Sequence, residues 1–211
     1  MDQLIDRYAH ARESDQYFTC ANVGCVRSGK SYMTKYLIKK IHRRYDVVMV
    51  FSNTANLNHA YHWLPAKKLF IVTDPDAGEP MLRQFMESQK KYVEVCLKAP
   101  RVLIIFDDFV APYLYTNKHF CNLFLNHRHY RCSVIFNTQS IRYIPPSVKE
   151  NLYWFTILSC RGLGEKKLRE LLDDVPTANL QDCLQVISRD YHFIVIDYSS
   201  VVPEVIMSQP V

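Results

Sequence analysis

The sequence predicts an α/β fold in which a mainly parallel central sheet is flanked by helices on both faces. Three observations carry this prediction. Short apolar runs of the buried-strand type alternate along the chain with longer segments whose apolar residues recur at helical spacing. A glycine-containing loop joins the first apolar run to the first amphipathic segment, and a later apolar run ends in two carboxylates.

The glycine-containing loop has the pattern G-x-x-x-x-G-K-[ST]. Its glycines let the backbone turn tightly, so successive N–H groups can point at phosphate oxygens. The lysine can place its charge on the β- and γ-phosphates, and the following hydroxyl can bind Mg²⁺. A strand before the loop and a helix N-terminus after it favour anion binding, so we expect a nucleoside triphosphate site. Its residues are Gly24, Cys25, Val26, Arg27, Ser28, Gly29, Lys30 and Ser31, with Tyr32 directly after.

The expected elements follow from apolar periodicity along the chain. The clearest helix is 80–98, with Pro80 suited to its first turn. Strands are expected near 17–23, 46–52, 69–73, 102–107, 132–138, 153–160 and 192–198, and helices near 31–44, 80–98, 116–128 and 164–174. Strands that alternate with helices predict right-handed crossovers between parallel strands.

The run 102–107 reads as a central strand whose C-terminal end carries Asp107 and Asp108. Open α/β sheets bind ligands at this edge, so both carboxylates are expected beside the phosphate loop. Asp107 is then expected to support Mg²⁺ through its waters, and Asp108 to polarise the attacking water. A helix cap or a solvated turn is the alternative for either residue.

The run 132–138 is a further buried strand, and Gln139 stands at its polar tip. Such a strand lies next to the carboxylate strand in P-loop ATPases with an inserted strand between loop and carboxylates, so we expect a RecA-like (additional-strand) P-loop NTPase core. A polar tip there can hold the attacking water and sense the γ-phosphate. Capping of a turn is the alternative for Gln139.

Length and composition favour one domain that spans residues 1–211, with an N-terminal arm at 1–15 and a loose tail at 204–211. Hydrophobic residues make up 48% of the chain, which allows a sizeable core. No run of about 18 apolar residues occurs, so no membrane partner is expected. The polar N-terminus has no apolar core of the signal-peptide type, which favours a reducing cytosol.

The seven cysteines include no C-x-x-C pair, which agrees with a reducing compartment. One cluster of histidines and cysteines, within residues 119–132, raises the question of a metal site. Its spacing matches no standard zinc pattern, and histidines on a helix surface are the alternative. The cluster comprises His119, Cys121, His127, His129 and Cys132.

The segment from Asn126 to Gln139 resembles the Arg-His, spacer, hydrophobic strand and Gln of viral genome-packaging ATPases. These are the poxvirus-type group within the FtsK/HerA superfamily of P-loop NTPases. The resemblance covers about residues 15–160 and is strongest over 100–145. The Asp107-Asp108 pair takes the carboxylate position of the family.

The resemblance implies roles for individual residues. Lys30 and Ser31 bind phosphate and Mg²⁺, Asp107 holds the metal, and Gln139 senses the nucleotide. Arg128 matches the arginine expected to reach into a neighbouring subunit's site, with Arg131 and Arg161 as competitors and a solvated surface arginine as the alternative. Many relatives carry Asp-Glu where this chain has Asp-Asp, so the carboxylate of Asp108 reaches one methylene less than the glutamate of those relatives.

The resemblance also implies partners: ATP and Mg²⁺ as cofactors, double-stranded DNA bound without sequence specificity, a capsid or portal protein, and a homo-oligomeric ring of five or six subunits. It places the protein in the host-cell cytoplasm or a viral factory, or with the virion. The net charge of +5 is modest for a DNA-binding protein. Candidate pore loops are 112–118 and 162–167, whereas the basic patch of Lys39, Lys40, Arg43 and Arg44 favours a solvated or subunit-facing helix surface.

Two other functions remain open. A nucleotide-binding switch or assembly module would bind nucleotide without hydrolysis, and the Asp-Asp pair slightly favours it. A small-molecule P-loop kinase would need an arginine-rich lid over a phosphate acceptor, and the sequence offers no convincing lid.

Overall fold

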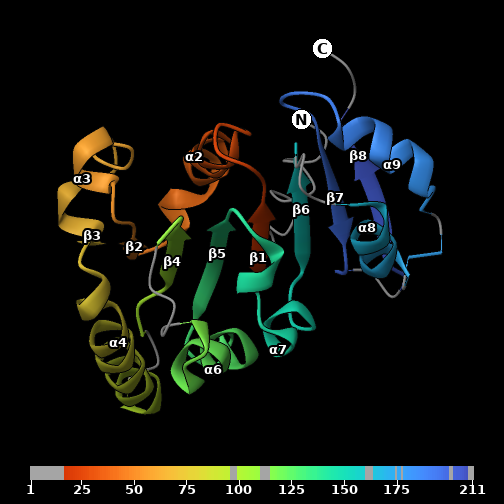
Figure 1. The fold of residues 1–211 in the computed structure, drawn as a ribbon. Helices are drawn as coiled ribbons and strands as arrows, with labels where there is room; N and C mark the ends of the chain where they lie inside the picture. The colour runs from red at the N-terminus through yellow and green to blue at the C-terminus, as the bar shows by residue number, and fades with distance from the viewer. Residues whose placement is uncertain are drawn as a thin grey trace.

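The strands form one eight-stranded sheet in the order β3-β2-β4-β5-β1-β6-β7-β8. The computed structural model describes residues 17–95, 99–109, 115–159, 164–173, 175–176, 178–199 and 202–208. The six strands from β3 to β6 in this order are parallel to one another. Strand β7 pairs antiparallel with β6 on one side and with β8 on the other. In Figure 1 the arrows of β4, β5 and β1 run side by side in one direction, and β7 runs opposite to β6. The predicted α/β fold is therefore confirmed.

Seven of the eight strands lie close to their predicted positions, and the central ones are apolar runs buried on both faces of the sheet. The strands are β1 (Thr19–Val23), β2 (Val47–Phe51), β3 (Leu69–Val72), β4 (Val102–Asp107), β5 (Cys132–Thr138), β6 (Trp154–Leu158), β7 (Phe193–Asp197) and β8 (Glu204–Met207). Strand β5 pairs with β4 on one side and with β1 on the other. It is therefore the inserted strand that the sequence predicts between the carboxylates and the phosphate loop.

Helices cover both faces of the sheet and bury one core on each face. Helix α2 (Lys30–Ile41) and the short α3 (Ala55–Asn58) contribute to the core on one face. The larger core on the other face lies beneath α4 (Pro75–Val95), α6 (Lys118–Asn126), α7 (Pro146–Lys149), α8 (Glu165–Leu172) and α9 (Leu180–Ile187). Short 3₁₀ turns lie at His42–Arg44, Ala66–Lys68 and Ile141–Tyr143.

Helix α4 begins one turn earlier than the sequence predicts. Its first residue is Pro75, which suits a position where no intrahelical N–H bond is needed. The side chain of Asp74 accepts a hydrogen bond from the backbone N–H of Asp76 at 3.0 Å and so caps the start. Pro80 consequently lies inside the helix rather than in its first turn.

The tail predicted for residues 204–211 is wrong over Glu204–Met207. This segment forms β8, which pairs with β7 and places its residues half-buried at the edge of the sheet. Its alternating apolar residues, such as Val205, pack against the core through that pairing. Among the described residues, no helix is long and apolar enough to cross a membrane.

Candidate active site

The phosphate-loop sequence forms a tight turn between β1 and α2. Gly29 has a φ of 98°, a left-handed conformation that glycine adopts without a steric penalty. Gly24 has no room for a side chain, because a Cβ there would collide with Ser28 Oγ. The loop is tied to two neighbouring strands: Gly24 N donates to Thr138 O at 3.2 Å, and Cys25 N donates to Ser159 O at 3.4 Å.

Lys30 is the first residue of α2 and its side chain is only 4% exposed. Its Nζ donates to Gly24 O at 2.7 Å and to Cys25 O at 3.0 Å. The ammonium group therefore lies directly beneath the loop backbone. The Oγ of Ser28 is buried in the same turn, with no hydrogen-bond partner among the described residues. A charged donor, an unpaired hydroxyl and a glycine turn make a cradle that fits a phosphate.

Asp107 ends β4 and lies beside the loop, as the sequence predicts. Its Oδ1 accepts a hydrogen bond from Ser31 Oγ at 3.3 Å, which brings the predicted pair of metal-binding residues together. A hydroxyl and a carboxylate on this edge are oxygen donors of the type that Mg²⁺ prefers. Asp107 also accepts hydrogen bonds from Asn137 Nδ2 and from Tyr61 OH, both at 2.7 Å.

Behind Asp107 a network of buried side chains joins β1, β5 and α2 to β4. Asn137 on β5 is bonded to Asn22 on β1 at 2.8 Å and to Thr34 on α2 at 3.0 Å. Asn22, Thr34 and Asn137 are each at most 2% exposed. Buried amides need partners, so this network holds the phosphate-loop strand, the helix and the carboxylate strand in one arrangement.

Asp108 follows β4 in a left-handed conformation with a φ of 44°. Aspartate is among the few residues that tolerate this region, and here it turns the carboxylate toward the loop. The Oδ2 atom of Asp108 lies 3.6 Å from Lys30 Nζ. Burial raises the pKa of Asp108, an effect that the charge of Lys30 and hydrogen bonds from Gln139 and Lys30 offset in part.

Gln139 lies at the tip of β5 with its side chain exposed. Its hydrogen bond to Asp108 places an amide beside the second carboxylate, on the same edge as the phosphate loop. The structure thus brings Lys30, Ser31, Asp107, Asp108 and Gln139 to one edge of the sheet. Tyr32 and the loop residues Val26 and Arg27 are exposed at this edge.

Arg128 lies at the opposite edge of the sheet, because it precedes β5 whereas the phosphate loop follows the parallel β1. The length of β5, roughly 20 Å at about 3.3 Å per residue, separates the two edges. Arg128 is exposed, and its guanidinium carbon lies 5.2 Å from the centre of the Tyr153 ring. The structure therefore does not bring Arg128 to the phosphate loop of its own chain.

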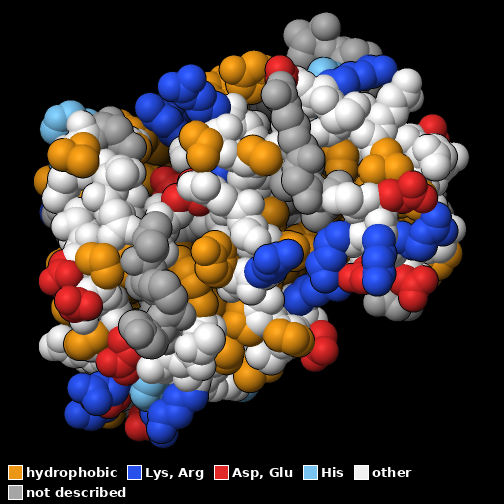
Figure 2. Space-filling view, viewed as in Figure 1, with side chains coloured by type: hydrophobic (Ala, Val, Ile, Leu, Met, Phe, Trp, Pro, Cys, Tyr) orange, Lys and Arg blue, Asp and Glu red, His pale blue; other side chains and the backbone are white. Residues whose placement is uncertain are grey.

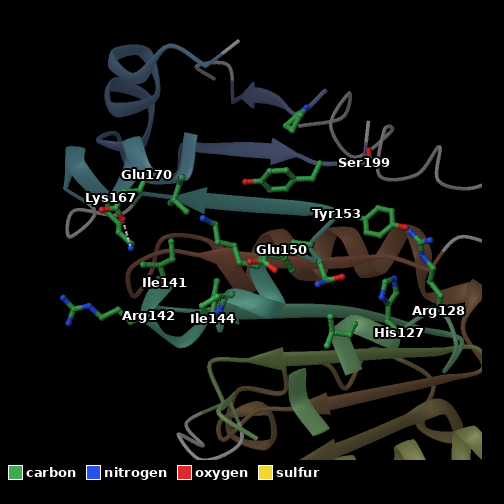
Figure 3. Close-up of a pocket in the computed structure, with 18 of the residues that line it drawn as sticks. His127, Arg128, Ile141, Arg142, Ile144, Glu150, Tyr153, Lys167, Glu170 and Ser199 are labelled. Atoms are coloured by element: carbon green, nitrogen blue, oxygen red, sulfur yellow. Dashed lines mark hydrogen bonds and ion pairs between the residues drawn. The ribbon is translucent and has the colours of Figure 1, made fainter. Parts of the chain in front are cut away.

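Arg128 and Tyr153 line one end of a groove of about 1190 Å³. Arg142 and Lys167 lie at its other end, as Figure 3 shows. Lys167 forms an ion pair with Glu170 at 2.9 Å. The groove runs past α7 from the end of α6, near Arg128, to the turn Ile141–Tyr143 and helix α8.

Arg131 and Arg161 are the other candidates for the arginine that acts on a neighbouring subunit's site. Nε of Arg131 donates to Tyr17 OH at 3.0 Å, and a left-handed φ of 49° places Arg131 in the turn before β5. Arg161 lies outside the described residues.

Among the described residues, no three His, Cys, Asp or Glu side chains are grouped so that they could hold a metal ion, and the histidine-cysteine cluster of 119–132 forms no such site.

The two predicted pore loops fall partly outside the described residues, at 112–114 and 162–163. The described part of the second, Gly164–Lys167, leads into α8. Figure 2 shows Lys and Arg side chains gathered over α8 with acidic side chains among them. Arg169 there pairs with Glu165 at 2.9 Å. This surface is mixed in charge rather than a continuous basic stripe.

Sequence reasoning missed Tyr61 and three members of the buried network. Asn137 was open to prediction, because a polar residue near the end of an apolar strand at the ligand edge is a site signal. Asn22 and Thr34 carry a weaker signal of the same kind. Nothing in the sequence marks Tyr61, since its contact with Asp107 depends on how residues 52–68 fold back over the sheet edge.

In comparison with known proteins, the chain is similar to proteins of viruses. The profile of the family described as Poxvirus A32 protein matches residues 6–196. The uncharacterized protein 075L of Invertebrate iridescent virus 6 is 28% identical over 131 residues, which is 62% of this chain. The match spans 50% of that curated relative's length.

Two solved structures share the fold. B204, the DNA-packaging ATPase of Sulfolobus Turreted Icosahedral Virus, superposes with a TM-score of 0.70 at 16% identity, covering 94% of this chain and 100% of that one. The genome-packaging NTPase B204 of Sulfolobus turreted icosahedral virus 2, in complex with AMPPCP, has a TM-score of 0.66 at 18% identity. That likeness covers 92% of this chain and 98% of the other.

Proposed function

Because the chain belongs to the poxvirus A32 protein family, we propose that it is an ATP-hydrolysing motor that moves double-stranded DNA into a viral capsid. The observation that carries the proposal is the grouping of Lys30, Ser31, Asp107 and Asp108 at one edge of the sheet. Support comes also from the shared fold of a protein described as a DNA-packaging ATPase. Translocation needs no base contacts, because such a motor holds the phosphate backbone.

Each residue of the site has a separate role in phosphoryl transfer. The loop N–H groups and Lys30 bind the β- and γ-phosphates of ATP, and Ser31 with Asp107 holds Mg²⁺. When bound, Mg²⁺ neutralises charge on the phosphate oxygens. Asp108 polarises the attacking water, and Gln139, bonded to Asp108, orients that water and senses the γ-phosphate.

Arg128 acts on the site of a neighbouring subunit. It lies at the edge opposite the phosphate loop and is exposed, so it can meet a neighbour's nucleotide only in an assembly. An arginine supplied in trans stabilises charge on the transferring phosphoryl group, an effect on the order of 10³–10⁵ in rate. We therefore propose a homo-oligomeric ring of five or six subunits that docks on a capsid or portal protein.

The test is steady-state ATP hydrolysis across a range of protein concentrations, with and without double-stranded DNA. We expect turnover to rise with both and to be lost in Lys30→Ala and in Arg128→Ala. Arg142→Ala is the matched control, since it removes an arginine from the other end of the same groove. A mixture of Lys30→Ala and Arg128→Ala chains should recover turnover, because each supplies the part that the other lacks.

The outcomes separate the candidate functions. Nucleotide binding with no hydrolysis under any of these conditions would favour a nucleotide-binding switch. Turnover that ignores DNA and requires a small phosphate acceptor would favour a kinase. Turnover that stays unchanged in Arg128→Ala would exclude this arginine as the trans-acting residue.

A further inference from the structure

Both carboxylate oxygens of Asp107 are held by donors from the fold. Oδ1 accepts from Asn137 Nδ2 at 2.7 Å and from Ser31 Oγ at 3.3 Å. Oδ2 accepts from Tyr61 OH at 2.7 Å. Of these three donors, Ser31 belongs to the phosphate loop and Asn137 to the strand beside β4, whereas Tyr61 comes from a separate segment of the chain.

Tyr61 reaches Asp107 through the connection between β2 and β3. Helix α3 lies in this connection. It is followed by His59, whose left-handed φ of 49° reverses the chain direction. The tyrosine ring that follows is 1% exposed and belongs to the same core as α2. A backbone hydrogen bond from Leu64 N to Tyr61 O, at 3.0 Å, closes the turn after it. The phenol is thus held rigidly with its hydroxyl aimed at the sheet edge.

The hydroxyl can only act as the donor in this pair. A tyrosine phenol loses its proton only at a pH of about 10, so at neutral pH the Tyr61 hydroxyl has a proton to donate. An ionised carboxylate accepts hydrogen bonds only. A bond between a neutral donor and an ionised acceptor is also stronger than one between neutral groups.

We propose that Tyr61 is a positioning residue of the metal site: by holding Oδ2 of Asp107, it turns Oδ1 toward Ser31, where the Mg²⁺ of the bound nucleotide is held. This rests on the proposed function, because it assumes that Ser31 and Asp107 share the metal. Outer groups that orient a metal-binding carboxylate typically change metal affinity or activity by about 10–100-fold when removed. Tyr61 also makes the connection after β2 part of the nucleotide site.

The chain offers a matched control for this tyrosine. Tyr45 is likewise buried, belongs to the same core, and donates its hydroxyl to Ser133 Oγ at 2.8 Å. Ser133 lies near the start of β5, at the opposite end of the strand from Asn137. Tyr61→Phe and Tyr45→Phe therefore each remove one buried hydroxyl and keep the ring in place, but only the first touches Asp107.

The experiment is a titration of Mg²⁺ against the binding of a fluorescent, non-hydrolysable ATP analogue, so its readout does not depend on turnover. We expect Tyr61→Phe to raise the half-saturating Mg²⁺ concentration by about tenfold. Binding measured in EDTA should stay unchanged in this variant, and Tyr45→Phe should leave both values unchanged. A direct Mn²⁺ titration followed by electron paramagnetic resonance should show the same order of affinities.

Two results would overturn the proposal. One is a Tyr61→Phe variant whose Mg²⁺ dependence equals that of Tyr45→Phe, which would leave Tyr61 a core residue only. The other is an unmodified chain that binds nucleotide equally with Mg²⁺ and with EDTA. A chain that shows the Mg²⁺ effect and the Tyr61 shift but never hydrolyses ATP would overturn the motor function and leave the role of Tyr61 intact.

Discussion

The ammonium of Lys30 and the carboxylate of Asp108 lie 3.6 Å apart, although Lys30 begins the helix after β1, Asp108 follows β4, and these two strands are not neighbours in the sheet. Strand β5 lies between them, and the left-handed backbone of Asp108 carries its side chain across that strand's end. The pair joins the phosphate loop to the carboxylate strand at the point where a γ-phosphate and its attacking water are expected.

Replacement of Asp108 tests its role in activating water. Asp108→Asn should lower kcat by on the order of 10²–10⁴, the usual contribution of a general base. Asp108→Glu should restore little, because glutamate tolerates the φ of 44° poorly and is longer by one methylene. The measurement is single-turnover ATP hydrolysis at saturating nucleotide. A full rate in Asp108→Asn would move the base role to another residue.

The pH profile of the same reaction follows from the shift of Asp108. Burial raises its pKa above the ordinary value of about 3.9. The rate should therefore fall on acidification through a pKa higher than that of a free aspartate, and Asp108→Asn should lose this limb. For folding the sign is the reverse: the contribution of Asp108 to stability is full below its unfolded pKa and is lost as pH rises through the folded one.

Lys30 should determine nucleotide affinity more than stability. Lys30→Ala should weaken ATP binding by about 10–100-fold, since a hydrogen bond to a charged group contributes about 1.5–3 kcal/mol. Equilibrium binding of a fluorescent nucleotide measures the effect. Lys39→Ala is the control, because Lys39 is an exposed lysine at the far end of the same helix. Equal affinities in the two variants would contradict a nucleotide site at this loop.

Asn137 should be a stability residue as well as a partner of Asp107. Asn137→Ala leaves Asn22, Thr34 and the carboxylate with fewer partners in a fully buried place, at a cost of about 1–3 kcal/mol in the free energy of unfolding. Urea denaturation measures this cost. Asn151→Ala removes a half-buried amide that donates to Ser147 O at 2.8 Å, and it should cost less. Equal losses would contradict the importance of the network.

His127 should make the fold sensitive to mild acid. It is buried, and burial lowers its pKa although the carbonyls of Phe124 and Tyr17, beside its two ring nitrogens, favour the charged form. Its contribution to stability is therefore full above the unfolded pKa of about 6.5 and is lost as pH falls through the lower folded pKa. Unfolding free energies between neutral and acidic pH should fall less steeply in His127→Gln. The exposed His129→Gln should keep the original slope.

Local patterns were sufficient to predict much of this protein. The apolar runs located β1 through β7, because a strand buried on both faces must be apolar throughout. The fixed spacing of Gly24, Gly29, Lys30 and Ser31 predicted the loop that the structure shows. The glycines permit the tight turn, and the lysine and the hydroxyl supply the groups that bind phosphate and Mg²⁺. The resemblance seen around residues 126–139 is confirmed by the family match over 6–196.

Helices α4 and α9 and strand β8 differ from the sequence prediction because their local sequence signals are weak. Proline favours a first turn, so the sequence predicts the start of α4 at Pro80, although Pro75 meets the same rule behind a capping Asp74. Helix α9 is not predicted, and the pattern of β8 predicts a tail, because an edge strand forms only through its partner β7. Pairing of this kind is a property of the sheet and not of the segment.

Local sequence patterns are sufficient for the fold class, the phosphate loop and a carboxylate pair at the end of a buried strand. The assembled sheet establishes two contacts that these patterns do not predict: Tyr61 holds Asp107, and Asp108 turns toward Lys30. The two kinds of feature depend on interactions that act over different distances along the chain. Propensity and periodicity act over a few neighbouring residues, whereas these contacts join segments that meet only when the sheet has assembled.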